Sequence, residues 1–182
     1  MKRESNAKST GGSNEKDKLA LMKLFQDELK DIYFAEKHLL KAMPKMAKSS
    51  TSDELRSGIE MHARQTEGQI ERLERVFELL GKKASAKTCE AMKGLVEEGK
   101  GILEDTESGT MTRDAGIISA LQKIEHYEIA SYGTLRTLAN VLGLTEAASL
   151  LEETLEEEKQ TDVKLTQIAE GFVNQQATAE QE

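Results

Sequence analysis

The chain has 182 residues, with 33 Asp and Glu against 25 Lys and Arg, and its formal net charge of −8 argues against a surface that binds the phosphates of a nucleic acid. This length fits one domain with its own hydrophobic core, and the single cysteine, Cys89, cannot form an internal disulfide. No apolar run approaches the roughly 20 residues that cross a bilayer, so we expect a cytoplasmic protein without a membrane partner.

The first segment, residues 1–15, is basic and polar and has no apolar run behind it, which predicts a disordered tail rather than a secretion signal. From Lys16 to about Lys48, apolar residues recur at the spacing of one buried helical face. Pro44 lies near the end of this helix, where it removes one backbone donor and is expected to bend the last turn.

A second helix is expected to begin near Ser52, because the sequence TSDE, residues 51–54, fits a capping box that starts at Thr51. Its apolar face continues to Leu80. Gly81 follows directly and suits the left-handed conformation that often closes a helix. The pattern therefore predicts about eight helical turns.

The third segment, residues 82–111, is less regular and contains a shorter helical pattern over 89–103, so it is interpreted as a crossover. Two more amphipathic patterns follow, over 113–142 and over 145–172, and both predict long helices. The remaining residues, 174–182, are polar and predict a tail that frays.

These patterns predict an all-α domain over residues 16–173, in which the four long helices form two antiparallel hairpins. Gly143 is expected to end the third long helix, and Thr145 to cap the fourth. Because the link between the hairpins is long enough to return along the bundle, the expected topology is the ferritin-like four-helix bundle with one crossover, which carries the short extra helix.

A projection at about 100° per residue shows polar side chains on the apolar face of all four long helices. All of them lie within about a turn of mid-height, so they are expected to share one level of the bundle. No Lys or Arg falls on these faces. The inward polar residues are Glu36, His62, Thr66, Gln69, Glu125, Glu128, Glu158 and Asp162.

A group of buried carboxylates is costly unless the charges are neutralised, by protons or by a cation. Hard divalent ions such as Fe²⁺ and Mn²⁺ accept carboxylate oxygens and imidazole nitrogen, and helical bundles hold pairs of such ions between facing helices. The sequence therefore predicts a site for one or two Fe or Mn ions. The candidate ligands are Glu36, His62, Gln69, Glu125, Glu128, Glu158 and Asp162.

Not every residue of this set has one interpretation. His62 is either a ligand or a residue that hydrogen-bonds to a ligating carboxylate, and the amide of Gln69 is a weaker donor. His126 and Tyr127 project away from the apolar face, towards solvent or an interface. Cys89 has no partner at metal or catalytic spacing, so a packed thiol is expected.

Five ordered blocks resemble the YciE/YciF-like bacterial stress proteins of the ferritin-like superfamily, over about residues 18–170. The blocks are YFAEKHLLKAMPKMA, HARQTEGQIERLERVFELLG, AMKGLVEEG, QKIEHYEIASYGTLRTLA and LLEETLEEEKQTDVKLTQIA. The resemblance implies a ferritin-like bundle with a di-iron or di-manganese site, a homodimer and a link to the general stress response.

Carried over by residue, Glu36 matches the ligand glutamate of the first helix, and Glu125 with Glu128 matches a Glu-x-x-Glu form of the third. The second and fourth helices depart from the superfamily's Glu-x-x-His. They offer His62 with Gln69, and Glu158 with Asp162, so this site has fewer basic nitrogens.

The leading interpretation is a stress protein with a dinuclear Fe or Mn site that reacts with peroxide or oxygen. One alternative is a protective helical bundle that is not an enzyme and acts through protein partners. Another is a storage cage, which requires a shell of many subunits.

Overall fold

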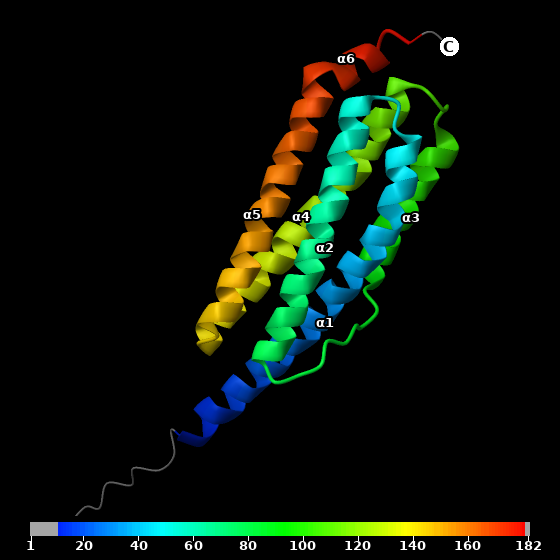
Figure 1. Ribbon diagram of the computed structural model, residues 1–182. Coiled ribbons are helices and arrows are strands. Elements are labelled where there is room, and N and C mark those ends of the chain that lie inside the picture. The colour runs from blue at the N-terminus through cyan, green and yellow to red at the C-terminus, as the bar shows by residue number, and fades with distance from the viewer. Residues whose placement is uncertain (1–10, 181–182) are drawn as a thin grey trace, which may run out of the picture.

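The computed structural model describes residues 11–180, and within this range the regular structure is entirely helical (Figure 1). The helices are α1 (Gly11–Ser49), α2 (Asp53–Leu79), α3 (Glu90–Asp105), α4 (Met111–Leu142), α5 (Thr145–Ile168) and α6 (Asn174–Ala177), with a π-helical turn η1 (Ala169–Val173) between α5 and α6.

The four long helices α1, α2, α4 and α5 lie side by side along one axis (Figure 1). The chain turns back between α1 and α2 and again between α4 and α5, so each pair is antiparallel. The link after α2 returns along the bundle as a loop and α3, and α4 therefore runs parallel to α2. Helix α3 packs against α4 and α1, outside the four-helix core. The predicted ferritin-like topology is confirmed.

The core is built from the apolar faces that the sequence pattern predicts. On α1, Phe25, Leu29 and Leu39 are fully buried, and equivalent faces of the other helices meet them. Burying such a side chain contributes about 2 kcal/mol, so these faces hold the four helices in one rotational setting. That setting fixes which polar side chains also point inward.

Both ends of the bundle differ from the prediction. Helix α1 begins at Gly11 rather than Lys16, and extends past the other helices with residues 15–20 exposed (Figure 1). Extending an existing helix costs less than starting one, so this part needs no tertiary packing. The rest of the predicted tail, residues 1–10, lies outside the described residues. Helix α1 also continues through Pro44 to Ser49.

The C-terminal segment was expected to fray from residue 174, but it forms the short helix α6 and then contacts α4. The carboxylate of Glu180 accepts hydrogen bonds from the backbone amide and the hydroxyl of Thr112. These hydrogen bonds satisfy two donors at the exposed start of α4 that would otherwise bond to water. They explain why the C-terminal segment is held against α4.

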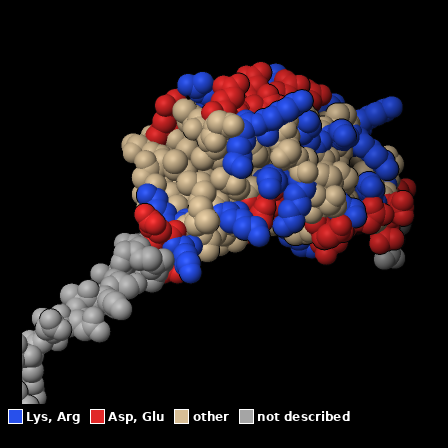
Figure 2. All heavy atoms as spheres, turned by 90° about the horizontal axis from the view of Figure 1, so that it is seen from below, with Lys and Arg blue, Asp and Glu red and all other residues tan. Residues whose placement is uncertain are grey.

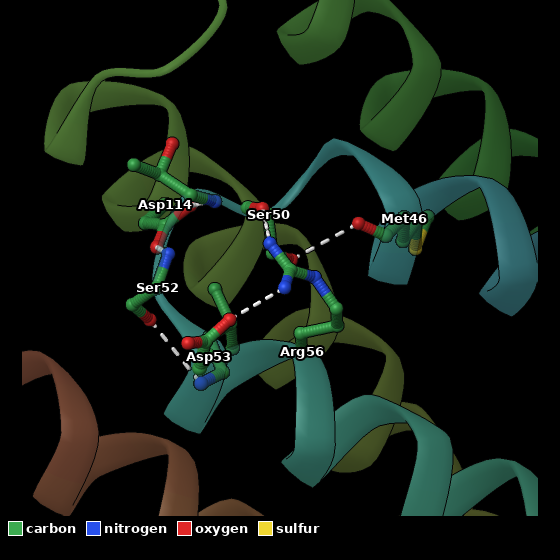
Figure 3. A network of polar contacts seen from close by, with 8 residues as sticks. Met46, Ser50, Ser52, Asp53, Arg56 and Asp114 are labelled. Carbon is green, nitrogen blue, oxygen red and sulfur yellow. Dashed lines mark hydrogen bonds and ion pairs between the residues drawn. The ribbon is translucent and has the colours of Figure 1, made fainter.

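The predicted capping box at the start of α2 is wrong. The cap is Ser52, whose hydroxyl accepts a hydrogen bond from the amide of Leu55. Thr51 is used differently, because its hydroxyl donates to the carbonyl of Thr110. The backbone amides of Thr51 and Ser52 both donate to the buried carboxylate of Asp114 on α4, at 2.7 and 2.8 Å (Figure 3). Asp114, which is distant in sequence, thus accepts the hydrogen bonds of backbone amides at the start of α2, where the sequence predicted a local capping box.

The two predicted glycine terminators are confirmed. Gly81 and Gly143 have φ angles of 66° and 77°, in the left-handed region where other residues are strained. Thr145 is not a cap, since Leu144 occupies the cap position and makes no capping hydrogen bond through its side chain.

Lys and Arg side chains are interspersed with Asp and Glu on the face of the molecule that Figure 2 shows, and they form no continuous basic surface there. Over residues 11–180, no helix combines the length and the apolar character that crossing a bilayer requires.

Candidate metal centre

Polar side chains from all four long helices meet in the middle of the bundle, as the sequence projection predicts. Six of the predicted ligands are buried, and we call the five of these that carry a carboxylate or an imidazole the acidic layer. The acidic layer consists of Glu36 on α1, His62 on α2, Glu125 and Glu128 on α4, and Glu158 on α5. The sixth buried residue, Gln69, lies further along α2 than His62, as does the buried Thr66.

Four members of the acidic layer are close enough to hold a common ion. His62, Glu125, Glu128 and Glu158 each offer one ligand atom, and these atoms all lie within 4.8 Å of one another. The Nε2 atom of His62 is 3.1 Å from Oε1 of Glu125, but the two atoms are not aligned for a hydrogen bond. The four ligand atoms are therefore grouped closely enough to bind one ion together, and the group is more than a single pairwise contact.

The carboxylates of the acidic layer lack hydrogen-bond donors. Among the described residues, no donor makes a hydrogen bond to either oxygen of Glu125, Glu128 or Glu158, or to the Oε2 atom of Glu36, although Nε2 of His62 lies 3.1 Å from Oε1 of Glu125. Glu125 and Glu158 can hydrogen-bond to each other only if one of them keeps a proton. An unpaired carboxylate in a dry interior costs several kcal/mol. These oxygens therefore require protons or a cation.

Burial is the main cause of the raised pKa values of the carboxyl groups in the acidic layer. It raises the pKa of Glu36 to about 7, although a hydrogen bond from Tyr132 opposes the shift, and it raises the pKa of Glu125 to about 8. The pKa of Glu128 and that of Glu158 are raised well above the ordinary value, by burial and then by the neighbouring Glu36. Without a cation, the acidic layer therefore holds protons near neutral pH.

Tyr132 fixes the orientation of Glu36. Its fully buried phenol donates a hydrogen bond to Oε1 of Glu36, whereas the Oε2 atom is buried and has no partner among the described residues. Burial, together with the negative charge of Glu36, raises the pKa of Tyr132 well above its usual range. The phenol therefore stays protonated and remains a donor.

Gln69 is oriented by an ion pair outside the acidic layer. Its Nε2 atom donates to Glu157 at 3.1 Å, and Glu157 accepts two hydrogen bonds from Arg72 at 2.5 and 2.7 Å. With the amide nitrogen bound to Glu157, the Oε1 atom of Gln69 is the free end of the amide group. It is buried and has no hydrogen-bond partner among residues 11–180. Burial opposes ionisation of Glu157, but the hydrogen bonds from Arg72 and Gln69 hold its pKa below the usual value.

Asp162 does not belong to the acidic layer, contrary to the sequence prediction. Its side chain is 21% exposed and lies at the edge between α4 and α5. There its carboxylate accepts a hydrogen bond from Gln122 at 3.2 Å and lies 3.4 Å from the imidazole of His126, which is mostly exposed as predicted. A position four residues after Glu158 is turned by about 40°, enough to move a side chain from the core to its margin.

Tyr132, Arg72 and Glu157 orient the site, but the sequence pattern does not identify any of the three as a site residue. The signal that could have revealed Tyr132 is its position one turn after Glu128 on the same helix face. Arg72 stands three residues after Gln69, but its partner is on another helix, and no local pattern shows that pairing.

Two residues that the sequence placed outside the site are also accounted for. Cys89 is buried and caps α3, where its sulfur accepts from the amide of Met92, as expected for a packed thiol. Tyr127 is half-buried and donates to Asp31 at 2.8 Å, rather than facing solvent.

The donor set of the acidic layer fits a hard or borderline divalent cation. It combines carboxylate oxygens and one imidazole nitrogen, and Gln69 outside the layer adds a buried amide oxygen; none of these donors is a thiolate. A cation at this point would replace the missing hydrogen bonds and neutralise the negative charges together. The buried cluster is thus compatible with a metal site.

Comparison with known proteins agrees with the fold and the family resemblance. Residues 20–178 match the family described as "Domain of unknown function (DUF892)". Protein YciF of Escherichia coli (strain K12) is 49% identical over 150 residues, which are 82% of this chain and 90% of that protein.

Solved structures agree in the same way. The crystal structure of the E. coli stress protein YciF superimposes with a TM-score of 0.81 and 48% identity, covering 85% of this chain and 97% of that one. YcfI from Rhodopseudomonas palustris gives 0.78 and 39%, covering 80% and 92%. A protein from Xanthomonas campestris pv. campestris gives 0.64 and 27%, covering 86% and 92%. The chain therefore belongs to the YciF-like family of bacterial stress proteins, within the ferritin-like superfamily.

Proposed function

We propose that this protein is a metal-binding stress protein whose acidic layer holds one or two Fe or Mn ions. The observation that carries the proposal is the convergence of buried carboxylates whose oxygens have no hydrogen-bond donor within the described chain. Removing several charges from water without pairing them opposes folding. A divalent cation turns that cost into binding free energy.

Two sets of donors support the count of one or two ions. His62, Glu125, Glu128 and Glu158 form the compact set, and they would hold the first ion. Glu36 and Gln69 each direct one unpaired oxygen inward, and with a shared carboxylate they would hold a second ion. Because only one histidine contributes, we expect the second ion to bind more weakly.

The family resemblance suggests that the loaded site reacts with a small oxidant such as peroxide or oxygen. The metal would supply electron transfer when it is bound. The chain itself excludes bulk water with its buried walls, orients Glu36 through Tyr132 and orients Gln69 through Glu157. These residues position the donors before the ion arrives, which lowers the cost of binding.

Metal binding is tested by titrating metal-free protein with Mn²⁺, and with Fe²⁺ under anaerobic conditions, in a calorimeter. We expect one or two ions per chain and a rise in the unfolding free energy of about 2.7 kcal/mol when the free metal is a hundred times the dissociation constant. An anomalous-scattering map should place the metal between α2, α4 and α5.

Two variants of α5 provide the control. Glu158→Gln keeps the size of a buried ligand but lowers its charge, and we expect it to weaken metal binding at least about tenfold. Glu156→Gln makes the same change at an exposed position, where the carboxylate pairs with Lys159, and should bind like the unchanged protein. If the unchanged protein takes up neither metal, the proposal is wrong and a protective bundle without metal is favoured.

We also propose that the protein works in the bacterial cytoplasm as a homodimer, on the basis of the family resemblance. Light scattering of the purified protein tests the subunit count. A mass of two chains supports the dimer, whereas a shell of many chains supports storage and a single chain contradicts both.

A further inference from the structure

One small cavity reaches the acidic layer from outside. It lies between α2, α4 and α5, has a volume of about 20 Å³, and includes His62 and Glu125 in its lining. A cavity needs roughly 10–15 Å³ on this measure to hold one water molecule, so a molecule with one or two heavy atoms fits. Wider grooves, such as one of about 570 Å³ around Pro44, do not include any residue of the acidic layer in their lining.

The cavity has a half-buried mouth and a buried floor. Gly58, Thr161 and Lys164 are half-buried at the mouth, and Thr161 lies 3.5 Å from Nδ1 of His62. The floor carries His62 and Glu125, whose Nε2 and carboxylate oxygens have no hydrogen-bond partner within residues 11–180. The remaining walls are the apolar side chains of Ile59, Leu121, Leu165 and Ile168.

The charge at the mouth of the cavity and the apolar walls behind it favour particular molecules. Lys164 forms no ion pair with any described carboxylate, so its positive charge at the mouth disfavours passage of a metal cation. The apolar walls disfavour large or strongly hydrated ligands. A neutral or singly negative molecule of two heavy atoms passes both restrictions, and dioxygen and peroxide are in that class.

We propose that this cavity is the access route and binding position for such a diatomic-sized molecule, on the His62 and Glu125 side of the acidic layer. The inference rests on the proposed metal function and adds the size class of the reactant and the helices between which it enters. Gly58 is the residue that keeps the mouth open, because a Cβ atom there would stand 3.8 Å from Ile168 and 4.0 Å from Lys164.

The experiment compares two glycines of the same helix. Gly58→Leu fills the mouth, whereas Gly68→Leu makes the same change where nothing lies within 4 Å of an added Cβ. The probe is nitric oxide, which has two heavy atoms and gives a distinct paramagnetic signal with Fe²⁺. We expect Gly58→Leu to slow its association with the Fe²⁺-loaded protein by about tenfold or more, since the route would then have to open first. Gly68→Leu should not change the rate.

A smaller substitution keeps the test valid if the leucine variant does not fold. Gly58→Ala fits within ordinary van der Waals contact and replaces a helical glycine, so it should fold at least as well as the unchanged protein. It should slow nitric oxide association by about two- to threefold, and Gly68→Ala should not slow it. The affinity of each variant for Fe²⁺, measured by calorimetry, should stay unchanged.

The outcomes separate the two proposals. If the unchanged protein binds no Fe²⁺, the proposed function is wrong and this inference is overturned with it. If all variants bind Fe²⁺ equally and nitric oxide associates at one rate in the Gly58 and Gly68 variants, only the access route is overturned. A bulky probe, tert-butyl isocyanide, should associate much more slowly than nitric oxide, and equal rates would contradict the size class.

Discussion

Two buried acidic regions of this molecule contrast in how their charges are satisfied. At one end of the bundle, the carboxylate of Asp114 is fully buried but accepts hydrogen bonds from two backbone amides at the start of α2 (Figure 3). In the middle, Glu125 and Glu128 are equally buried, and no donor of the described chain makes a hydrogen bond to their carboxylates.

The contrast shows that burial alone does not identify a functional acid. Asp114 closes the end of the bundle by joining α4 to the turn between α1 and α2, and its negative charge faces the positive end of a helix dipole. The acidic layer has no comparable support. A buried carboxylate without a donor is the feature that points to a missing cation.

The largest expected effect is at the satisfied acid. Asp114→Ala leaves two half-buried backbone amides without an acceptor, and we expect a loss of about 4 kcal/mol of unfolding free energy, with or without metal. Denaturation in urea measures it. Asp53→Ala is the control, because that carboxylate is exposed and pairs only with Arg56, and should cost less than about 1 kcal/mol. Equal losses of unfolding free energy in the two variants would show that the hydrogen bonds to Asp114 do not stabilise the protein more than an exposed ion pair does.

The next effect is the pH dependence of the metal-free protein. Burial raises the pKa of Glu36 to about 7 and that of Glu125 to about 8, from an ordinary value of 4.5. The folded state therefore binds more protons than the unfolded state between about pH 4.5 and 8, so the unfolding free energy falls as pH rises through this window. At roughly 1.4 kcal/mol per pKa unit, the shift of Glu36 alone corresponds to a fall on the order of 3 kcal/mol.

Saturation with Mn²⁺ should flatten this pH profile, because the metal competes with the protons for the same oxygens. Thermal unfolding at several pH values, with and without metal, measures both profiles. A metal-free profile that rises from pH 5 to 8 would show that the acids of the acidic layer are not the dominant titrating groups.

A smaller effect is expected from removing one charge of the acidic layer. Glu128→Gln should stabilise the metal-free protein by about 2 kcal/mol at pH 8, since folding then no longer requires a buried carboxyl to take up a proton that the unfolded chain lacks at this pH. The gain should disappear at pH 5, where the glutamate is protonated, and the variant should lose metal-dependent stabilisation. Calorimetric melting at the two pH values tests this, and a variant destabilised at both would mean that Glu128 is held by partners.

The smallest effect is expected at the one acid of the layer that has a donor. Tyr132→Phe removes the hydrogen bond to Glu36 and should cost about 1 kcal/mol in the metal-free protein. It should also raise the pKa of Glu36 further, because that hydrogen bond lowers it. Tyr33→Phe, which removes a hydrogen bond to the exposed Glu74, is the control and should leave metal affinity unchanged.

Much of the acidic layer could be predicted because each helix turns its residues by a fixed angle. Glu36, Glu125 and Glu158 are buried as their positions among apolar neighbours indicate. Asp162 shows the limit, because a side chain near the margin of a face is assigned by the neighbouring helix and not by its own. The cap at Ser52 shows the same limit, since the competing acceptor, Asp114, is about sixty residues away.

The sequence by itself determined the helices, their buried faces and the level of the bundle at which the acids lie, because these depend on local periodicity, and the resemblance of its five ordered blocks indicated the family. Only the tertiary structure decided which acids have donors, which edge receives Asp162 and where the small cavity opens. Those outcomes depend on distances between atoms of different helices. Such distances follow from the packing of all four helices together, and no single stretch of the chain contains them.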